Sequence, residues 1–380
     1  MTDDVPTPSG AHPRATTSRP SVRARILAVP VTVGIIVLCI GAFVSTLGAC
    51  TMQVDDPRSM LAGSWLVLEG CDDTLAGLGA LRMADLWLDG SWWRVISAGL
   101  LHGSWLHLIL NTWSLWVVGE WVEPTWGHAR TAVLFALSSV CGCLASAAWV
   151  EASMVVGASA GIMGMAGALL VGRVLGRGAV AKRLRPVSAW ILGGWLVVLV
   201  GVGAVVPVVA QAGHLGGLAT GALLGVSWSG REAIVGVAGR VGLMIVFAAL
   251  VLMARQPEGR PAYYEHLGHG YLSRGQDLEA VAAFERALEQ RPDEVSLANG
   301  VAYGLAKAGV QLERAEELVE RALAEEPENA DYLDTLGWIY CRRGEVERGM
   351  AVLERASVAS EGAVEEIEQH RVECAGAGIE

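Results

Sequence analysis

The chain has 380 residues, of which 53% are hydrophobic and only 18% are charged. A water-soluble globular protein carries more charge than this on its surface, so the composition excludes an ordinary soluble domain as the whole molecule. The formal net charge is −11, whereas nucleic-acid binding requires a basic face, so we expect no nucleic-acid partner.

Charge and hydropathy divide the chain near residue 255. Residues 1–255 contain 16 Lys and Arg against 13 Asp and Glu, a net charge of +3, and carry long apolar stretches that stop near residue 254. Residues 256–380 contain 12 basic and 26 acidic residues, a net charge of −14. This division predicts a membrane domain followed by an acidic, water-soluble domain.

The N-terminal segment, residues 1–25, is rich in Pro, Ser, Thr and Arg and poor in apolar residues, which predicts a disordered tail. The apolar run from Ile26 to Ala49 is too long for the core of a signal peptide, and more apolar runs follow it. We therefore interpret it as a signal-anchor helix.

Seven stretches are long and apolar enough to be membrane spans, which need about 20 residues each. The fourth and sixth are short and rich in Gly and Ala, a composition typical of helices that pack closely against other helices. The predicted spans lie near residues 26–49, 99–119, 130–150, 155–172, 187–209, 213–229 and 236–254.

Basic residues orient these spans, because cytoplasmic loops carry an excess of Lys and Arg. Four Arg precede the first span, and the loop from Arg173 to Arg185 holds five basic residues and no acid. We expect a cytoplasmic N-terminus and, after seven crossings, an external C-terminal domain, in a multi-pass protein of the bacterial inner (plasma) membrane. The weak point is the seventh span, which has Arg240 near its start. If that helix does not cross, the C-terminal domain is cytoplasmic.

Residues Gly157 to Gly161 match the pattern GxSxG around Ser159. In a glycine-rich chain this match alone is weak, and its simplest interpretation is a small-residue packing face. The nucleophile elbow of a soluble hydrolase would need a strand before the Ser, whereas this Ser opens a predicted membrane helix.

Polar residues inside other spans strengthen the functional interpretation, because ionisable groups are costly in a bilayer and usually functional. His107 and Asn111 lie four residues apart on one face of the second span. His214 opens the sixth span and shares its face with Gly217 and Gly221, which would let another helix approach closely. Contact between the Ser159 hydroxyl and the His214 imidazole would form a nucleophile–base pair.

With these residues in view, most of residues 26–230 resemble the rhomboid family of intramembrane serine proteases. Four separated motifs carry the resemblance, in the family's order: Trp93-Arg94 as the WR pair, His102–Asn111 as HxxxxHxxxN, Gly157–Ser159 as GxS, and His214–Gly221 as HxxGxxxG. Two positions depart from the family's usual pattern, with Gly213 where Ala commonly precedes the His and Ala160 where Gly commonly follows the Ser. The resemblance implies an all-α fold, a polytopic transmembrane bundle of six core helices plus one.

The resemblance also implies roles for individual residues. Ser159 would be the nucleophile and His214 the general base, in a dyad without an Asp and without a cofactor. His107 and Asn111 would be oxyanion-hole donors, which stabilise the charge that develops on the carbonyl oxygen. The substrates implied are transmembrane proteins, cleaved in or near their membrane helices. His102, Trp93 and Arg94 would be structural.

The C-terminal part, residues 261–358 after a linker at 255–260, repeats with a period near 34. Small residues recur at this spacing, as at Ala280, Ala315 and Gly349. The pattern resembles tetratricopeptide repeats, an α-solenoid of helix pairs whose concave surface binds peptides or proteins. A plain helical bundle is the alternative, and residues 359–380 are expected to form a C-terminal tail.

The seven Cys form no metal-binding motif. Cys50 and Cys71 both fall in the predicted outer loop, where oxidation can occur, and the sequence leaves open whether they form a disulfide.

Two other functions compete with proteolysis. A catalytically inactive member could bind membrane proteins as a scaffold, although such a protein would have no reason to keep both Ser159 and His214. A transporter would require charged residues along a path and internal duplication, and the sequence has neither.

Overall fold

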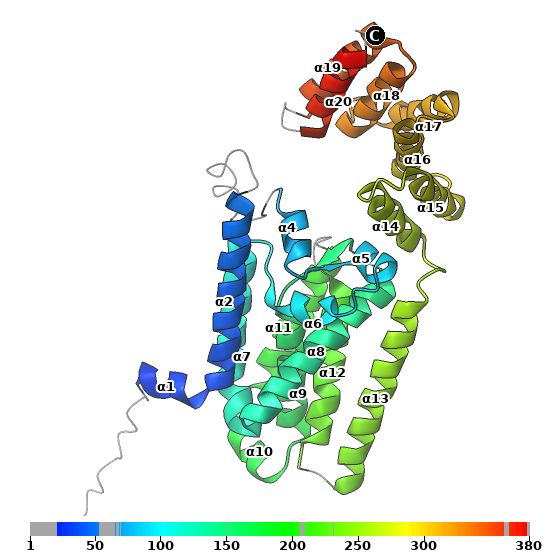
Figure 1. The fold of residues 1–380 in the computed structure, drawn as a ribbon. Helices are drawn as coiled ribbons and strands as arrows, with labels where there is room; N and C mark the ends of the chain where they lie inside the picture. The colour runs from blue at the N-terminus through cyan, green and yellow to red at the C-terminus, as the bar shows by residue number, and fades with distance from the viewer. Residues whose placement is uncertain are drawn as a thin grey trace, which may run out of the picture.

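The computed structural model describes residues 21–377 except for 53–64, 66–67, 69, 151, 206–209, 231 and 361–364. The disorder expected for most of the N-terminal tail lies outside these residues. The described chain folds into a bundle of long helices with a second group of shorter helices above one end of it (Figure 1).

Each of the seven predicted spans overlaps one long helix of the bundle. These helices are α2 (Pro30–Thr51), α7 (Trp105–Trp126), α8 (His128–Trp149), α9 (Ser159–Leu175), α11 (Ala189–Val205), α12 (Gln211–Ser227) and α13 (Ala233–Arg255). Three of them, α2, α8 and α13, are long and apolar enough to cross a membrane by themselves. A fourth candidate is α9 together with α10 (Gly178–Leu184), although the two are bent by 111° relative to each other. Crossing by the remaining helices stays a prediction.

The bundle turns large apolar side chains outward, as a protein in lipid does. Trp113 of α7 is 70% exposed, Trp190 of α11 is 92% exposed, and Met244 of α13 is 62% exposed. A soluble domain would bury such side chains. The outward apolar surface agrees with the membrane domain predicted from composition.

Two helix boundaries differ from the predicted ones for local reasons. The first apolar run is broken at Pro30, which separates the short helix α1 (Val22–Ala28) from α2, because proline cannot donate the backbone hydrogen bond of a helix interior. The second span begins at Trp105 rather than near residue 99, since the Ser104 hydroxyl accepts a hydrogen bond from the His107 amide and caps the helix there.

A buried carboxylate fixes the start of α2 against α7. Glu123 accepts hydrogen bonds from the backbone amides of Val31 and Thr32, each at 2.9 Å, and from the Thr32 hydroxyl at 2.7 Å. The first amides of a helix have no partner within it, so a carboxylate from a neighbouring helix satisfies them and favours the positive end of the helix dipole.

The first loop, between α2 and α7, is built of short elements: α4 (Asp72–Gly77), β1 (Leu81–Arg82), α5 (Met83–Leu88), α6 (Arg94–Ser97) and the 3₁₀ helix η1 (Ala98–Leu100). The strand β1 pairs antiparallel with β2 (Met154–Val155), with Leu81 opposite Val155 and Arg82 opposite Met154. The loop is therefore joined by backbone hydrogen bonds to the segment that leads into Ser159.

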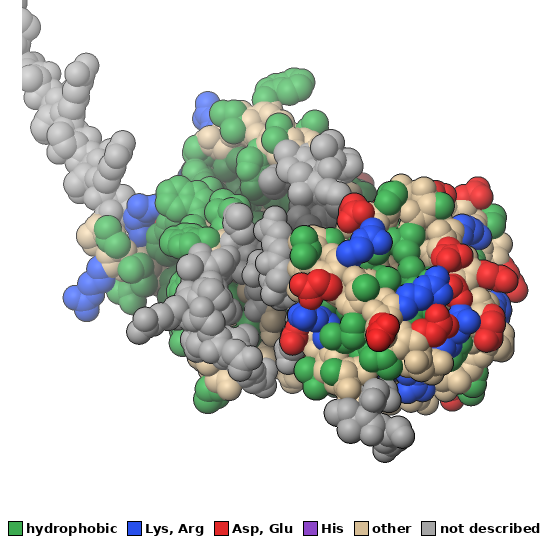
Figure 2. All heavy atoms as spheres, turned by 90° about the horizontal axis from the view of Figure 1, so that it is seen from above, with side chains coloured by type: hydrophobic (Ala, Val, Ile, Leu, Met, Phe, Trp, Pro, Cys, Tyr) green, Lys and Arg blue, Asp and Glu red, His purple; other side chains and the backbone are tan. Residues whose placement is uncertain are grey.

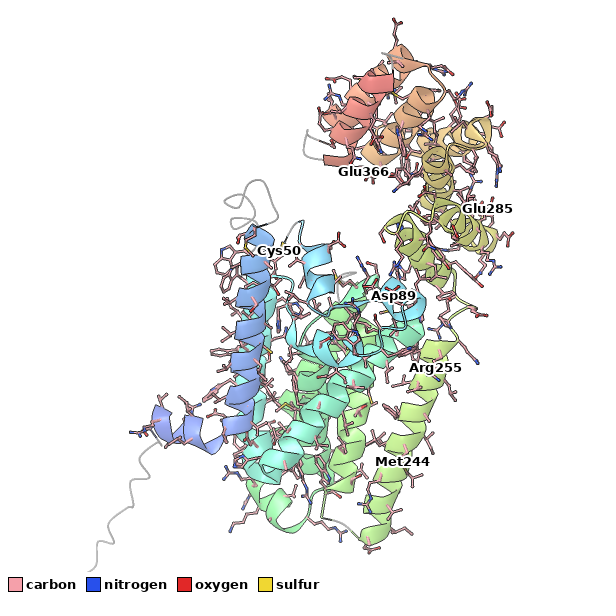
Figure 3. All side chains as sticks on the ribbon, viewed as in Figure 1. Cys50, Asp89, Met244, Arg255, Glu285 and Glu366 are labelled. Carbon is pink, nitrogen blue, oxygen red and sulfur yellow. A yellow bond between two sulfur atoms is a disulfide. The ribbon has the colours of Figure 1, made fainter. Side chains whose placement is uncertain are left out.

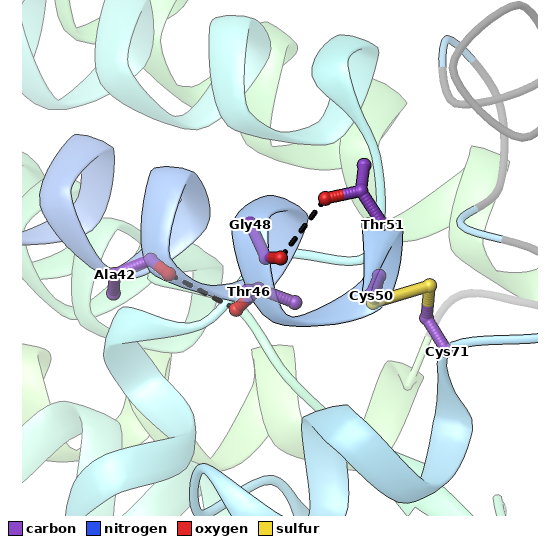
Figure 4. The surroundings of a disulfide bond; sticks show 6 residues. All are labelled: Ala42, Thr46, Gly48, Cys50, Thr51 and Cys71. Carbon is purple, nitrogen blue, oxygen red and sulfur yellow. Dashed lines mark hydrogen bonds between the residues drawn. A yellow bond between two sulfur atoms is a disulfide. The ribbon is translucent and has the colours of Figure 1, made fainter. Parts of the chain in front are cut away.

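A disulfide between Cys50 and Cys71 closes the first loop onto the end of α2, which decides the question that the sequence left open (Figure 4). A second disulfide joins Cys341 to Cys374 in the C-terminal helices. The free cysteines of the described chain, Cys39, Cys141 and Cys143, all lie buried in bundle helices.

The C-terminal helices form consecutive antiparallel pairs, as the 34-residue period predicts. The pairs are α14 (Pro261–Leu272) with α15 (Asp277–Gln290), α16 (Val295–Ala308) with α17 (Leu312–Glu325), and α18 (Ala330–Arg342) with α19 (Val346–Ala359). The recurring small residues Ala280, Ala315 and Gly349 lie where helices meet, and the first two are fully buried. Acidic and basic side chains mix on the surface of this part (Figure 2).

Helical structure extends past residue 358 into the segment expected to be a tail. Helix α20 (Glu365–Ala377) packs on α18 and α19. The Cys341–Cys374 disulfide and a contact between His370 and the buried Asp334 hold it in place. Thus α20 covers the apolar end that the third pair would otherwise expose.

The helical repeats contact the first loop through a buried carboxylate, Asp85 of α5. Figure 3 labels Asp89, which lies in the same loop below the repeats. Arg274, directly after α14, lies 2.8 Å from Asp85 and 2.6 Å from Asp89. Asp85 also contacts Arg82 at 3.0 Å and Arg94 at 3.2 Å. One carboxylate therefore binds guanidinium groups from the loop and from the repeats.

Burial alone would raise the pKa of Asp85, but hydrogen bonds from Arg82 and Arg274 and the charge of Arg94 lower it below its ordinary value of 3.8. A carboxylate whose pKa is lowered in the folded state stabilises that state above its ordinary pKa, and the stabilisation is lost only as the pH falls through the lowered value. The contact between repeats and loop is therefore intact at neutral pH.

This contact predicts a local effect of Arg274→Ala. The substitution removes the guanidinium that joins α14 to Asp85 and Asp89, so hydrogen exchange of the α5 amides, measured by mass spectrometry, should become faster. The matched control is Arg314→Ala, which removes an ion pair with Glu285 inside the repeats and should leave α5 unchanged. Equal exchange of α5 in the two variants would contradict the docking role.

Candidate functional site

The structure brings Ser159 and His214 together from two helices. Ser159 is the first residue of α9, His214 lies in the first turn of α12, and the Ser159 Oγ is 2.9 Å from the His214 Nε2. Both side chains are partly buried. The other ring nitrogen of His214, Nδ1, is buried and has no hydrogen-bond partner among the described residues. The pair therefore has the geometry of a dyad without an orienting carboxylate.

Close backbone packing between α9 and α12 makes this contact possible. A Cβ atom on Gly217 would collide with the Ala160 carbonyl oxygen, and one on Gly221 would collide with the Gly164 carbonyl oxygen. Larger residues at these positions would push the two helices apart and separate His214 from Ser159. The small-residue face and the polar pair, which the sequence presents as alternatives, are thus parts of one arrangement.

The two departures from the family pattern are accommodated by neighbouring small residues on α8. The Ala160 side chain points at Gly142, where any Cβ would collide with it. A Cβ on Gly213 would lie 2.7 Å from the Ser146 hydroxyl oxygen, so glycine avoids this clash. Neither departure disturbs the distance between Ser159 and His214.

His107 lies beside the turn that precedes Ser159. A Cβ atom on Gly157 would lie 2.7 Å from the His107 ring, and Gly157 has a positive φ of +121°, a conformation that favours glycine. The His102 ring meets the His107 ring edge to face at 5.0 Å between centroids. The structure therefore places His107 beside the turn that leads into Ser159, with the His102 ring against it.

Asn111 is 6% exposed, and its amide nitrogen donates a 2.8 Å hydrogen bond to the His107 carbonyl oxygen, one turn earlier in α7. Its amide is therefore engaged with its own helix in the structure. The same nitrogen carries a second N–H, which can donate to an oxyanion while this bond stays in place.

Trp93 and Arg94 lie away from the Ser159–His214 pair, in the first loop. Arg94 donates to the Ala76 and Ala80 carbonyl oxygens and contacts Asp85, which holds α4, β1 and α5 together. Its position agrees with the structural role expected from the sequence.

Two residues that support the site were missed from the sequence. Ser104 fixes the start of α7 and thereby the direction of His107, and a Ser just before an apolar run is a recognised helix-start signal. Asp85 had no such signal, because its partner in the repeats, Arg274, lies 189 positions away. Among the described residues, no group of three or more His, Cys, Asp or Glu could hold a metal ion.

These features define a polytopic helical membrane protein with a paired Ser and His where two of its helices meet. Residues 89–231 match the family model of the Rhomboid domain, which includes Ser159, His214, His107 and Asn111. Residues 89–231 therefore form a Rhomboid domain, and helical repeats follow it in the chain.

Curated relatives agree with this assignment. The chain is 28% identical over 288 residues to "Rhomboid protease GluP" of Bacillus subtilis, covering 75% of this chain and 49% of the relative. It is 29% identical over 184 residues to "RHOMBOID-like protein 4" of Arabidopsis thaliana, covering 48% and 44% respectively. It also resembles "Inactive RHOMBOID-like protein 8" of Arabidopsis thaliana, 32% identical over 97 residues, covering 26% and 28%. The chain thus spans about half the length, or less, of these relatives.

Among solved structures, the chain has a TM-score of 0.27 and 13% identity to the "TPR2AB-domain:pHSP90-complex of yeast Sti1", covering 80% of this chain and 99% of that one. A score this low carries no argument about the fold. The repeat architecture rests instead on the helix pairs described above.

The position of Asn111 predicts a graded effect on catalysis. Asn111→Ala should lower the cleavage rate of a transmembrane substrate by about 10²–10³, the usual cost of one oxyanion donor, while a fluorophosphonate still labels Ser159 slowly. Thr112→Ala is the matched control, because the Thr112 hydroxyl also bonds to its own helix, at the Leu108 carbonyl. Wild-type cleavage by Asn111→Ala would reduce Asn111 to a packing residue.

Proposed function

We propose that the protein is an intramembrane serine endopeptidase that cleaves transmembrane-protein substrates through a Ser159–His214 dyad. The observation that carries the proposal is the 2.9 Å separation of the Ser159 Oγ and the His214 Nε2 inside a helical membrane bundle. A hydroxyl in contact with an imidazole is an activated nucleophile, and the imidazole has the right basicity near neutral pH.

In the proposed reaction, the Ser159 oxygen attacks the carbonyl carbon of the scissile peptide bond and passes its proton to the His214 Nε2. The tetrahedral intermediate collapses when His214 returns that proton to the leaving amine nitrogen, which leaves an acyl-enzyme. Water, deprotonated by His214, then attacks the acyl carbon and releases Ser159. No cofactor takes part in these steps.

Oxyanion stabilisation is assigned to donors around the start of α9. The Ser159 backbone amide lies at the N-terminus of that helix, where amides are free of intrahelical partners and the helix dipole favours negative charge. His107, which lies against Gly157, and Asn111 supply the side-chain donors.

An inactive scaffold that binds membrane proteins is the second candidate function, and the name of one relative makes it a real alternative. The contact between Ser159 and His214 favours the enzyme, because binding alone requires neither a hydroxyl nor an imidazole at these positions.

We place the protein in the bacterial inner (plasma) membrane with its N-terminus in the cytoplasm and its repeats outside. The helix α10, with Lys182 and Arg183, and the helix α1, with Arg23 and Arg25, lie at one end of the bundle, whereas the first loop and the repeats lie at the other (Figure 1). Basic segments favour the cytoplasmic side. The Cys50–Cys71 and Cys341–Cys374 disulfides lie at the opposite end, and disulfides persist in oxidising compartments.

The repeats are assigned to protein binding. Their helix pairs stack side by side from α14 to α20, which is the arrangement that creates an extended surface for a peptide or protein ligand. Docked beside the first loop, they would hold the external part of a substrate near the protease.

Catalysis by the dyad predicts that Ser159→Ala abolishes cleavage of a model transmembrane substrate without loss of expression. His214→Ala should also abolish cleavage and, in addition, fluorophosphonate labelling, because Ser159 is then not activated. Ser153→Ala is a control in the same segment, since Ser153 precedes β2 and is exposed. Unchanged cleavage by Ser159→Ala would exclude the mechanism.

Topology predicts the behaviour of reporter fusions. An alkaline-phosphatase fusion after Glu380 should be active, and a fluorescent protein that folds only in the cytoplasm should be dark there. The same fusions after Leu184, at the end of α10, should give the reverse pattern. Activity of the cytoplasmic reporter after Glu380 would place the repeats inside.

A further inference from the structure

The repeats contain a groove that the protease mechanism does not use. It has a volume of about 520 Å³. It is bordered by the first helix of each pair, α14, α16 and α18, and by the C-terminal helix α20. Aromatic side chains of Phe284, Tyr303 and Tyr332 form part of its wall.

Acidic groups outnumber basic groups in this groove. Glu265, Asp331, Asp334 and Glu366 line it, against Lys307 as the one Lys or Arg in its described lining. Two of the acids have internal partners, because Glu265 pairs with Arg291 and Asp334 contacts His370.

The other two acids have no cationic partner. Asp331 and Glu366 are exposed, and neither forms an ion pair within the described chain, although Glu366 accepts a hydrogen bond from Tyr303. Glu366 lies at the lower end of α20 in the view of Figure 3. The Asn299 side-chain oxygen, also in the groove lining, is buried and has no hydrogen-bond partner. The groove therefore offers two carboxylates without a cationic partner and one buried amide oxygen without a hydrogen bond, which a ligand rich in cationic donors can bind.

We propose that this groove binds an extended, Lys- and Arg-rich segment in the external part of a membrane-protein substrate. That the bound segment belongs to a substrate rests on the proposed function, whereas the binding itself does not require catalysis. Lys and Arg supply the donors and positive charge that Asp331, Glu366 and Asn299 lack, and their aliphatic stems can lie on the aromatic wall. The net charge of −14 over residues 256–380 attracts such a segment from a distance.

Charge also makes this recognition selective. External segments of membrane proteins are, as a class, poorer in Lys and Arg than cytoplasmic ones. A groove that requires basic residues outside the membrane would therefore recruit a small subset of the membrane proteins present.

The helix α14 joins the groove to the protease. Glu265 and His269 of α14 line the groove, whereas Gly270 packs on Ala84 of α5 and Arg274 binds Asp85. A segment held in the groove is thus tethered at a defined place beside the first loop. Tethering turns encounter with the active site into an intramolecular event, with an effective concentration on the order of mM for a short flexible connection.

Binding is tested with the full-length Ser159→Ala protein in nanodiscs and a fluorescent ten-residue peptide of alternating Lys, Arg and Ser, by anisotropy. The peptide should bind, and its affinity should fall with added salt. The double variant Asp331→Asn/Glu366→Gln should weaken binding at least tenfold. The matched control is Glu313→Gln/Glu317→Gln, which removes the same charge from exposed positions of α17 outside the groove and should bind like the parent.

Absence of binding, or equal loss in the two double variants, would overturn the proposal. A cleavage assay then separates it from the proposed function. With Ser159 intact, the groove variant should lower cleavage of a substrate carrying the basic segment at least fivefold and leave unchanged the cleavage of the same substrate without it. Failure to cleave either substrate would count against the protease, whereas equal cleavage of both by every variant would count against the groove alone.

Discussion

Backbone contact between α9 and α12 is the constraint on which the site depends. In a membrane, apolar side chains gain little by leaving lipid for a helix interface, so close packing and polar contacts must hold helices together. Glycine at positions 217 and 221 lets the α12 backbone reach the carbonyl oxygens of Ala160 and Gly164. This approach brings His214 within 2.9 Å of Ser159, at a place where a longer separation would leave two unpaired polar groups in an apolar bundle.

The charged contacts of the first loop connect the helices around Ser159 to the repeats. Asp85 gathers Arg82, Arg94 and Arg274, and Arg82 belongs to the strand that pairs with Met154. A continuous set of contacts therefore runs from the repeats, through the loop, to the segment before Ser159. A buried carboxylate without a partner costs free energy, so the ion pairs with Asp85 stabilise the positions of these arginines.

Different residues were predictable to different degrees. The contact between Ser159 and His214 could be predicted because GxSxG and HxxGxxxG lie on separate apolar runs, and polar or ionisable residues within membrane helices are costly and usually functional. The docking contact could not, since Arg274 and Asp85 are 189 positions apart and no motif links them. The helix α20 was missed for a related reason: its hold on the repeats comes from Cys374 and His370, whose partners lie on α18.

The sequence by itself determined the membrane domain, the acidic repeats, the resemblance to the rhomboid family and the residues of the candidate site. These follow from local properties, namely hydropathy, charge and the spacing of a few residue types, which a chain carries whether or not it is folded. Only the tertiary structure decided that Cys50 pairs with Cys71 and that any residue larger than glycine would collide at position 217. It also decided that the repeats contact the first loop through Asp85. Each of these depends on distances between segments remote in the chain, and packing of the whole molecule sets those distances.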